Sequence, residues 1–457
     1  MSPGMNPNPT VVEGKIGSHT IRFETGRLAG QAGGAVTASV GETMVLATAT
    51  ASEPRGAGDF FPLTIDVEER MYSAGKIPGG FFRREGKSSE KATLTARLID
   101  RPMRPAFVDG FRHEVHCVVT SLAVDDSNPM DVLAINATSA ALALSDMPFE
   151  GPVGAARMSH IDGQWVANPS FEEREEETIE LVVAGRKNDA GEVDIMMIEA
   201  GASENCFDLI EAGAASPDES LLADGIERSK SYISEVIALQ QELVDAVGGV
   251  SKGSTSGPDP DYPLFVDYTD AIYNRVREEA EPDVKEAIGI QEKPDRKKKL
   301  TLIEDAVAER LAEEFPEEGH MVKPALRALT KKLVRQRIVE ENRRLDGRGK
   351  DEVRPIWTQV GVLPRVHGSG IFTRGETQAL CVTTLGMQRM EQMIDDLSQD
   401  DRKRYMHHYN FPPYSTGEAG FMRGPKRREI GHGALAEKAL TASIPLKDDF
   451  PYAIRVV

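Results

Sequence analysis

The spacing of apolar side chains predicts a mixed α/β fold for residues 11–225. Polar and apolar residues alternate from Lys15 to Phe23, as they do in a half-buried strand. Glu90 to Leu98 has the apolar spacing of a helix, which Asp100-Arg101-Pro102 is expected to end. Further elements are expected at 35–40 and 44–49 (a strand pair), 115–124 (a strand), 132–144 (a buried helix) and 179–184 (a buried strand).

The pattern changes twice in the second half of the chain. Residues 216–247 have helical periodicity, and residues 248–263 are rich in Gly, Ser, Pro and Asp, which is typical of a linker. Residues 264–344 return to helical spacing with dense charge, and β-type alternation resumes from Leu345. We therefore expect a disordered lead-in at 1–10, a first core at 11–225, a helical domain at 226–344 and a second core at 345–457.

One order of short motifs occurs twice. Gly41-Glu42-Thr43 recurs as Gly375-Glu376-Thr377, and three more motifs follow in the same order, with the offset drifting only from 334 to 347. Four matches in register indicate a duplicated domain, with the helical segment between the copies. Because the second copy stops inside the apolar alternation at 452–457, we expect it to be truncated. The other matches are Tyr72-Ser73-Ala74-Gly75 with Tyr414-Ser415-Thr416-Gly417, Arg83-Arg84-Glu85 with Arg427-Arg428-Glu429, and Glu90-Lys91-Ala92 with Glu437-Lys438-Ala439.

Composition narrows the class of protein. A length of 457 residues predicts several domains, at roughly 100–200 residues each. No run of about 18 apolar residues occurs, so no membrane span is expected. The three cysteines are far apart and show neither a disulfide framework nor zinc spacing, which fits a reducing cytoplasm. The net charge of −19 argues against a general nucleic-acid coat protein, although a local basic groove remains compatible with it.

A first basic cluster spans Lys76 to Arg104. It holds eight basic and three acidic residues around Gly79-Gly80-Phe81-Phe82-Arg83-Arg84. Two glycines, two aromatics and two arginines suit an exposed loop on which bases stack and phosphates bind. The alternative is that Phe81 and Phe82 anchor the loop in the core and that the charges are merely solvated.

A second basic cluster comprises Arg423, Lys426, Arg427, Arg428 and His432, interrupted by Gly and Pro. Adjacent arginines can grip phosphate oxygens in a bidentate manner. A solvated basic turn is the alternative, but the repeat favours a role, because both copies place Arg-Arg-Glu before a helix. Weaker candidates are His113–His116 and His407-His408 as metal pairs, Asp395-Asp396 and Asp400-Asp401 as a cation site, and Lys297–Lys299 as an RNA contact.

Together these motifs resemble the polynucleotide phosphorylase family. Phe81 to Gly86 and Arg97 to Pro102 resemble the first core of that family. Asn410 to Tyr414 and Lys426 to Gly433 resemble the start of its second core. The similarity covers nearly the whole chain in the right order. It implies two RNase PH-like cores, the second truncated here, separated by an all-helical domain, within a ring-shaped homotrimer that threads single-stranded RNA.

The resemblance also implies site residues and chemistry. The expected activity is phosphorolytic, reversible 3′-to-5′ degradation of RNA in mRNA turnover, with inorganic phosphate as co-substrate and Mg²⁺ or Mn²⁺ as cofactor. RNA-degradation assembly proteins are expected partners, and the location is expected to be cytoplasmic. The expected catalytic residues are Arg427, Arg428 and His432; the expected RNA-binding residues are Phe81, Phe82, Arg83, Arg84, Arg97, Arg101 and Arg104.

One segment departs from the family pattern. Thr178 to Gly185 stands where the active core of the family has Asp-x-Asp-x-Lys-Val-Ala-Gly, so the first core is expected to be catalytically inactive. The metal ligands of the second core are expected beyond Val457, so no metal ligand is expected within this chain. Two other functions stay open, a hydrolytic 3′ exonuclease and a non-catalytic RNA-binding ring scaffold, and some actinobacterial-type relatives suggest alarmone synthesis as a third.

Overall fold

The computed structural model describes residues 9–54, 60–248 and 262–457. The chain divides into two compact units. The larger unit comprises residues 1–263, 361–370 and 380–457, and the smaller comprises 264–360 and 371–379. Each unit is described by itself.

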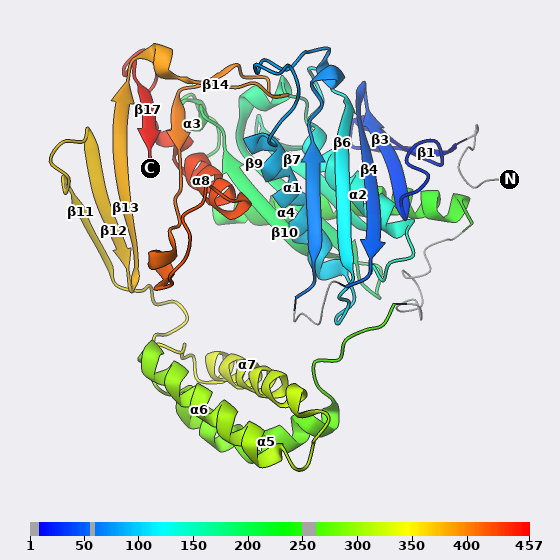
Figure 1. The fold of residues 1–457 in the computed structure, drawn as a ribbon. Helices are drawn as coiled ribbons and strands as arrows, with labels where there is room; N and C mark the ends of the chain where they lie inside the picture. Colours follow the sequence, from blue (N-terminus) through cyan, green and yellow to red (C-terminus); the bar gives the residue numbers. More distant parts are fainter. Residues whose placement is uncertain (1–8, 55–59, 249–261) are drawn as a thin grey trace. The chain divides into compact units, whose positions relative to one another are not determined.

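The first sheet of the larger unit has six strands in the order β1-β2-β3-β4-β6-β5 (Figure 1). All neighbours are antiparallel except β5 and β6. The buried helix α2 packs on β3 and β4, and its close approach requires Gly34, where an added Cβ would lie 1.9 Å from the carbonyl oxygen of Ala141. The elements are β1 Thr10–Ile16, β2 His19–Thr25, β3 Gly34–Val40, β4 Thr43–Ser52, β5 Leu63–Glu68, η1 Met71–Ala74, α1 Glu90–Met103, η2 Arg104–Ala106, β6 Glu114–Ala123 and α2 Met130–Ala143.

A second, antiparallel sheet has the order β10-β9-β7-β8. The long helix α4 packs on β7 and β9, where Met158, Leu181 and Ile233 join one buried apolar cluster. This cluster holds the sheet and the helix together, because its side chains leave water on folding. The elements are β7 Val153–Ile161, β8 Gln164–Ala167, η3 Glu173–Glu176, β9 Glu177–Lys187, β10 Val193–Ala202, α3 Cys206–Glu211 and α4 Glu219–Ala246.

The C-terminal part of the larger unit repeats the centre of the first sheet. β13, β17 and β16 are neighbours in that order, antiparallel and then parallel, as β4, β6 and β5 are. This shared strand order confirms the predicted duplication in the fold. The expectation that Arg-Arg-Glu precedes a helix in both copies was wrong for the second copy, because α8 begins at Arg427 and includes the motif, whereas α1 begins at Glu90, after the first motif. From residue 356 onward the elements are β11 Ile356–Val360, β12 Gly368–Arg374, β13 Thr377–Gly386, η5 Gln388–Met390, β14 Gln392–Met393, β15 Arg402–Lys403, β16 Tyr405–His407, η6 Pro413–Thr416, α8 Arg427–Leu440, η7 Thr441–Ser443 and β17 Ala453–Val456. Of these, β11 and parts of β12 and β13 are assigned to the smaller unit.

The smaller unit contains the predicted helical segment. Its helices are α5 (Asp270–Ala287), α6 (Lys293–Leu311) and α7 (Val322–Glu340), with the short η4 (Gly319–Met321) before α7. Their apolar faces share one core that includes Val276, Val307 and Leu329. The three- and four-residue spacing in the sequence therefore predicted this unit correctly.

Three local expectations were wrong. Lys15 to Phe23 is a hairpin and not one strand, because Gly17 has a φ of +66° and turns the chain between β1 and β2. Pro102 does not end α1, which runs to Met103; both residues are buried in the core, and Arg104 N–H still donates to the Asp100 carbonyl. Thr10, expected in the lead-in, begins β1.

The expected linker falls largely on residues 249–261, and the lead-in on residues 1–8, all outside the described residues. The proposed boundary after residue 225 lies within α4, which is continuous from 219 to 246.

Candidate functional site

The loop around Phe81 and Phe82 is exposed. The side chains are 93% and 85% exposed, so the alternative in which they anchor the core does not hold. Arg83 has a φ of +49° and donates to the carbonyl oxygens of Pro78 and Gly79, each at 3.3 Å. Gly79 N–H also donates to Asp395 at 2.9 Å. The loop thus presents two aromatic faces beside the exposed Arg83 and Arg84.

The three arginines of the α1 region have different surroundings. Arg97 lies against Gly431 of α8, where an added Cβ would be 2.2 Å from its Nε. Arg101 donates to Glu199 at 2.8 Å and to the carbonyl oxygen of Ile198 at 3.0 Å. Arg104 bridges Asp100 and the carbonyl oxygens of Phe61 and Leu63, so its guanidinium has a structural role in the first core.

The start of α8 holds the second arginine pair. Arg427 binds the carbonyl oxygen of Ile65 at 2.6 Å and forms an ion pair with Asp66 of β5. The Asp66 carboxylate also lies 2.7 Å from His116 Nε2. Burial alone would raise the pKa of Asp66, but His116 and Arg427 together lower it. The Asp66 carboxylate therefore stays anionic. The guanidinium of Arg428 lies 4.6 Å from the ring centroid of Phe411.

His432 lies one turn into α8, in edge-to-face contact with Tyr409 at 5.1 Å between ring centroids. Burial, and then the positive charges of Arg428 and Arg97, lower the pKa of His432. The imidazole is therefore neutral at pH 7, with one nitrogen able to donate a hydrogen bond and the other able to accept one.

A cavity of about 950 Å³ lies between α1, α8 and β10. It brings together three of the predicted site residues: Arg97, Arg101 and His432. Arg428 faces a different hollow, formed by residues 410–429, and the two phenylalanines line neither. Apart from Arg104, the predicted residues therefore lie at three places on the larger unit, namely the aromatic loop, the α1–α8 cavity and the start of α8.

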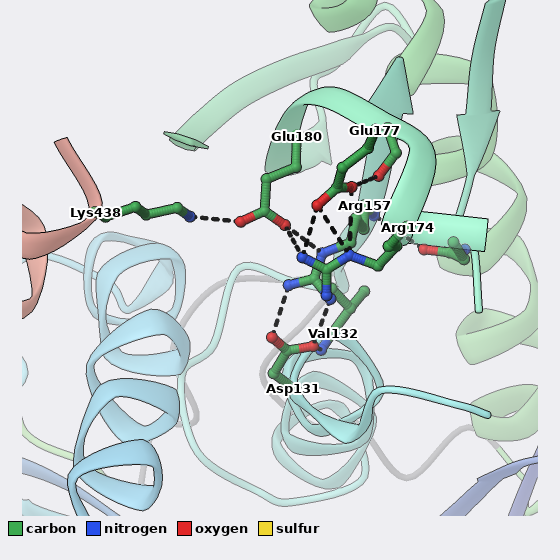
Figure 2. A network of polar contacts seen from close by, with 9 residues as sticks. Asp131, Val132, Arg157, Arg174, Glu177, Glu180 and Lys438 are labelled. Carbon is green, nitrogen blue, oxygen red and sulfur yellow. Dashed lines mark hydrogen bonds and ion pairs between the residues drawn. The ribbon is translucent and has the colours of Figure 1, made fainter. Parts of the chain in front are cut away.

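A buried ionic network ties the first core to α8 (Figure 2). Arg157 of β7, 7% exposed, binds Asp131 of α2 at 2.7 Å and lies 3.1 Å from Glu180 of β9. The Glu180 carboxylate also binds Arg174 at 2.8 Å and Lys438 of α8 at 2.6 Å. Burial alone would raise the pKa of Glu180, but Arg157, Lys438 and Arg174 lower it to about 2.

This network includes Glu180, which lies in the segment that departs from the family pattern. Glu180 stands at the second Asp position of that pattern, and Val182 at the Lys position. The three cations Arg157, Arg174 and Lys438 face three carboxylates, those of Asp131, Glu177 and Glu180, so the network has no excess negative charge to hold a cation. Sequence reasoning missed the network and the Asp66 contact, because both join residues distant in sequence and no local pattern marks them.

Three protein-family models match parts of the chain. Residues 17–148 and, separately, 352–457 match the model of the 3′ exoribonuclease family, domain 1. The chain belongs to the 3′ exoribonuclease family. Domain 2 of this family matches residues 151–215, and the model described as polyribonucleotide nucleotidyltransferase, RNA binding domain, matches residues 271–349. Domain 1 is thus matched on both sides of the helical unit, as the repeat predicted.

Curated relatives agree with this family placement. Polyribonucleotide nucleotidyltransferase of Acidothermus cellulolyticus is 54% identical over 445 residues, which is 97% of this chain and 56% of that protein. The Salinispora arenicola protein of the same name is 53% identical, over 98% of this chain and 56% of its own length. The Mycobacterium tuberculosis protein is 52% identical, over 98% and 59%. The chain therefore spans little more than half the length of the relatives it matches.

No helix within the described residues is both long and apolar enough to cross a membrane.

Proposed function

We propose that the protein containing this chain degrades single-stranded RNA from the 3′ end by phosphorolysis and releases nucleoside diphosphates. The paired arginines at the start of α8 carry the proposal, together with the names of the 52–54% identical relatives. Two guanidinium groups at a helix N-terminus suit an anionic co-substrate, because both the N–H groups and the arginines favour negative charge. A hydrolase, which uses water, has less need of such a pair.

The reaction asks mainly for positioning and charge neutralisation. A phosphate oxygen attacks the phosphorus of the last phosphodiester, and a new phosphoanhydride bond forms as the bond from that phosphorus to the 3′ oxygen breaks. The 3′ oxygen takes a proton and becomes the new RNA end. One phosphodiester is exchanged for one phosphoanhydride, so excess nucleoside diphosphate reverses the reaction into polymerisation.

We assign Arg427 and Arg428 to the phosphate and the scissile end. Arg427 is 48% exposed and already binds an anion, the Asp66 carboxylate, so phosphate binding exchanges one anionic partner for another. Neutral His432 is assigned a hydrogen bond to the 3′-terminal nucleotide. Arg97, which lies against Gly431 beside His432, adds positive charge from the first core, and Arg101 lines the same cavity.

We assign Phe81, Phe82, Arg83 and Arg84 to the RNA strand upstream of the scissile bond. Exposed aromatic rings stack on bases of any sequence, at about 1–3 kcal/mol per base, and arginines meet the phosphates. Arg104 was expected to bind RNA; its guanidinium is held by Asp100 and the carbonyl oxygens of Phe61 and Leu63.

We propose Mg²⁺ or Mn²⁺ as the cofactor of the whole protein from the family resemblance alone. The described residues include no group of three or more His, Cys, Asp or Glu placed to hold a metal ion, so they do not fit one.

Family membership also supports a homotrimeric ring, action in mRNA turnover in the cytoplasm, and association with other RNA-degradation proteins.

The proposal is tested by replacing Arg427 and Arg428 with Ala in the full-length protein. Phosphorolysis of poly(A) is expected to fall by at least about 100-fold, the typical effect of removing charge-stabilising donors, while the sedimentation coefficient stays unchanged. Arg228→Ala, which removes an exposed arginine of α4 that pairs with Asp224, is the control and is expected to keep full activity. Normal activity in the double variant would refute the assignment.

A further inference from the structure

The second core builds a loop of the same construction as the aromatic loop of the first. In the first core, η1 ends at Gly75, which has a φ of +68° and donates to the Tyr72 carbonyl. In the second, η6 ends at Gly417, which has a φ of +72° and donates to the Tyr414 carbonyl. Each short helix therefore ends in the same left-handed turn, and each turn leads into a segment rich in Gly.

A glutamate closes the base of each loop. Glu85, the third residue of the first Arg-Arg-Glu, accepts a hydrogen bond from Met71 N–H at 3.1 Å. Glu429, its counterpart, accepts from Phe411 N–H at 3.1 Å and from Lys426 N–H at 2.8 Å. Backbone N–H donors lower the pKa of both carboxylates, so both closures persist at neutral pH. The duplication thus includes the loop and its closure as well as the helix that follows.

The two loops also present the same chemistry at the surface. Phe421 is 88% exposed and Met422 76%, against 93% and 85% for Phe81 and Phe82. Arg423 follows Met422 as Arg83 follows Phe82. The loop borders a hollow of about 720 Å³ whose lining includes Arg423, Lys426 and Arg428. Because the Phe421 ring is so exposed, it contributes nothing to core packing. An aromatic residue at this position therefore has another role.

We propose that the loop of residues 417–426 is a second binding loop for single-stranded RNA. Phe421 stacks on a base, Met422 adds apolar contact, and Arg423 with Lys426 binds the phosphates. The inference rests on the proposed function only for the identity of the ligand. Two exposed apolar side chains flanked by cations suit a base and its phosphate better than a protein partner, whose interface requires about 1,000 Å² of complementary surface.

The test measures RNA binding without phosphate, so that no turnover occurs. The full-length protein is titrated against a fluorescein-labelled 20-nucleotide oligo(A) at 150 mM NaCl. Phe421→Ala is expected to raise the dissociation constant at least fivefold, which corresponds to the lower limit of about 1 kcal/mol for one stacked base. Phe421→Tyr keeps a ring and is expected to stay within twofold of the parent protein. Phe207→Ala, which removes a 55% exposed ring of α3, is the matched control and leaves binding unchanged.

The charge contribution is read from the salt dependence. Arg423→Ala is expected to lower the slope of log affinity against log salt by about 0.7, the value for one phosphate contact on a single strand. Unchanged affinity in Phe421→Ala, or equal losses in Phe421→Ala and Phe421→Tyr, would overturn the inference. A changed sedimentation coefficient with unchanged oligo(A) binding would also overturn it and would assign the loop to a protein contact. If phosphorolysis fails but these binding results hold, the proposed reaction is wrong and the loop assignment stands.

Discussion

Replacing Arg157 with Gln removes the central cation of the buried network. The side chain lies between Asp131, at 2.7 Å, and Glu180, at 3.1 Å, and is 7% exposed. Gln carries no charge and ends about where Arg157 has its Nε, so Asp131, which the terminal Nη2 reaches, loses its ion pair. Arg174 and Lys438 remain beside Glu180 and compensate it in part.

The expected loss can be worked out in two ways. Removing one partner of a buried ion pair costs about 3–5 kcal/mol, because the other charge is left buried and unpaired. For Glu180 alone, a pKa lowered from 4.5 to about 2 corresponds to roughly 3 kcal/mol at about 1.4 kcal/mol per pH unit. Since Arg174 and Lys438 account for part of that pKa change, we expect Arg157→Gln to cost about 3 kcal/mol of the free energy of unfolding.

Urea unfolding followed by tryptophan fluorescence measures this loss. The chain has two tryptophans, Trp165 and Trp357, and Trp165 packs on the cluster between β7, β9 and α4. In a Trp357→Phe background, the fluorescence therefore reports on the first core alone. The matched control is Arg228→Gln, which breaks an Arg–Asp pair of the same 2.7 Å length with partners 61% and 48% exposed. That control is expected to cost less than about 1 kcal/mol.

The pH dependence has a definite sign. Because the folded pKa of Glu180 is lowered, its stabilisation is complete above pH 4.5 and is lost as the pH falls from 4.5 toward 2. The difference between the parent protein and Arg157→Gln is thus expected to be constant from pH 7 to 5 and to shrink at pH 4. Equal losses in Arg157→Gln and Arg228→Gln, or a difference that grows below pH 4.5, would refute the reasoning.

Two further predictions concern other parts of the molecule. The double variant Phe81→Ala/Phe82→Ala is expected to weaken binding of a long oligo(A) more than that of a very short one, because the loop contacts RNA away from the scissile bond. A binding titration of both lengths tests this, and equal effects on the two lengths would argue against the loop's role in RNA binding. Exposed Cys381 is expected to react with a maleimide at pH 8 well before Cys117, since burial raises the pKa of the Cys117 thiol to about 12. Mass spectrometry of the labelled peptides gives the order of labelling, and early labelling of Cys117 would contradict its burial.

Local pattern predicted much of this fold. The apolar run at 132–144 predicted the buried helix α2, and the apolar spacing in residues 264–344 predicted three helices. Both predictions succeeded because the period of apolar residues determines which side of an element is buried. The hairpin at Gly17 was missed because one glycine with positive φ interrupts a continuous alternation.

Long-range pairing had no such signal. Arg427 meets Asp66 across 361 positions, and Lys438 reaches Glu180 from the other core. The sequence around Arg427 or Lys438 contains no pattern that indicates the partner of that residue. Likewise, the motif singled out Arg427 and His432, but only the structure showed that Arg97 accompanies His432 whereas Arg427 is held by β5.

The central claim is the phosphorolytic reaction, and the released nucleotide tests it most directly. The full-length protein is incubated with poly(A) and Mg²⁺, with and without inorganic phosphate, and the products are separated by chromatography. The account predicts ADP, released only when phosphate is present. Release of AMP in the absence of phosphate would contradict it and identify a hydrolase, and RNA binding without any released nucleotide would identify a scaffold.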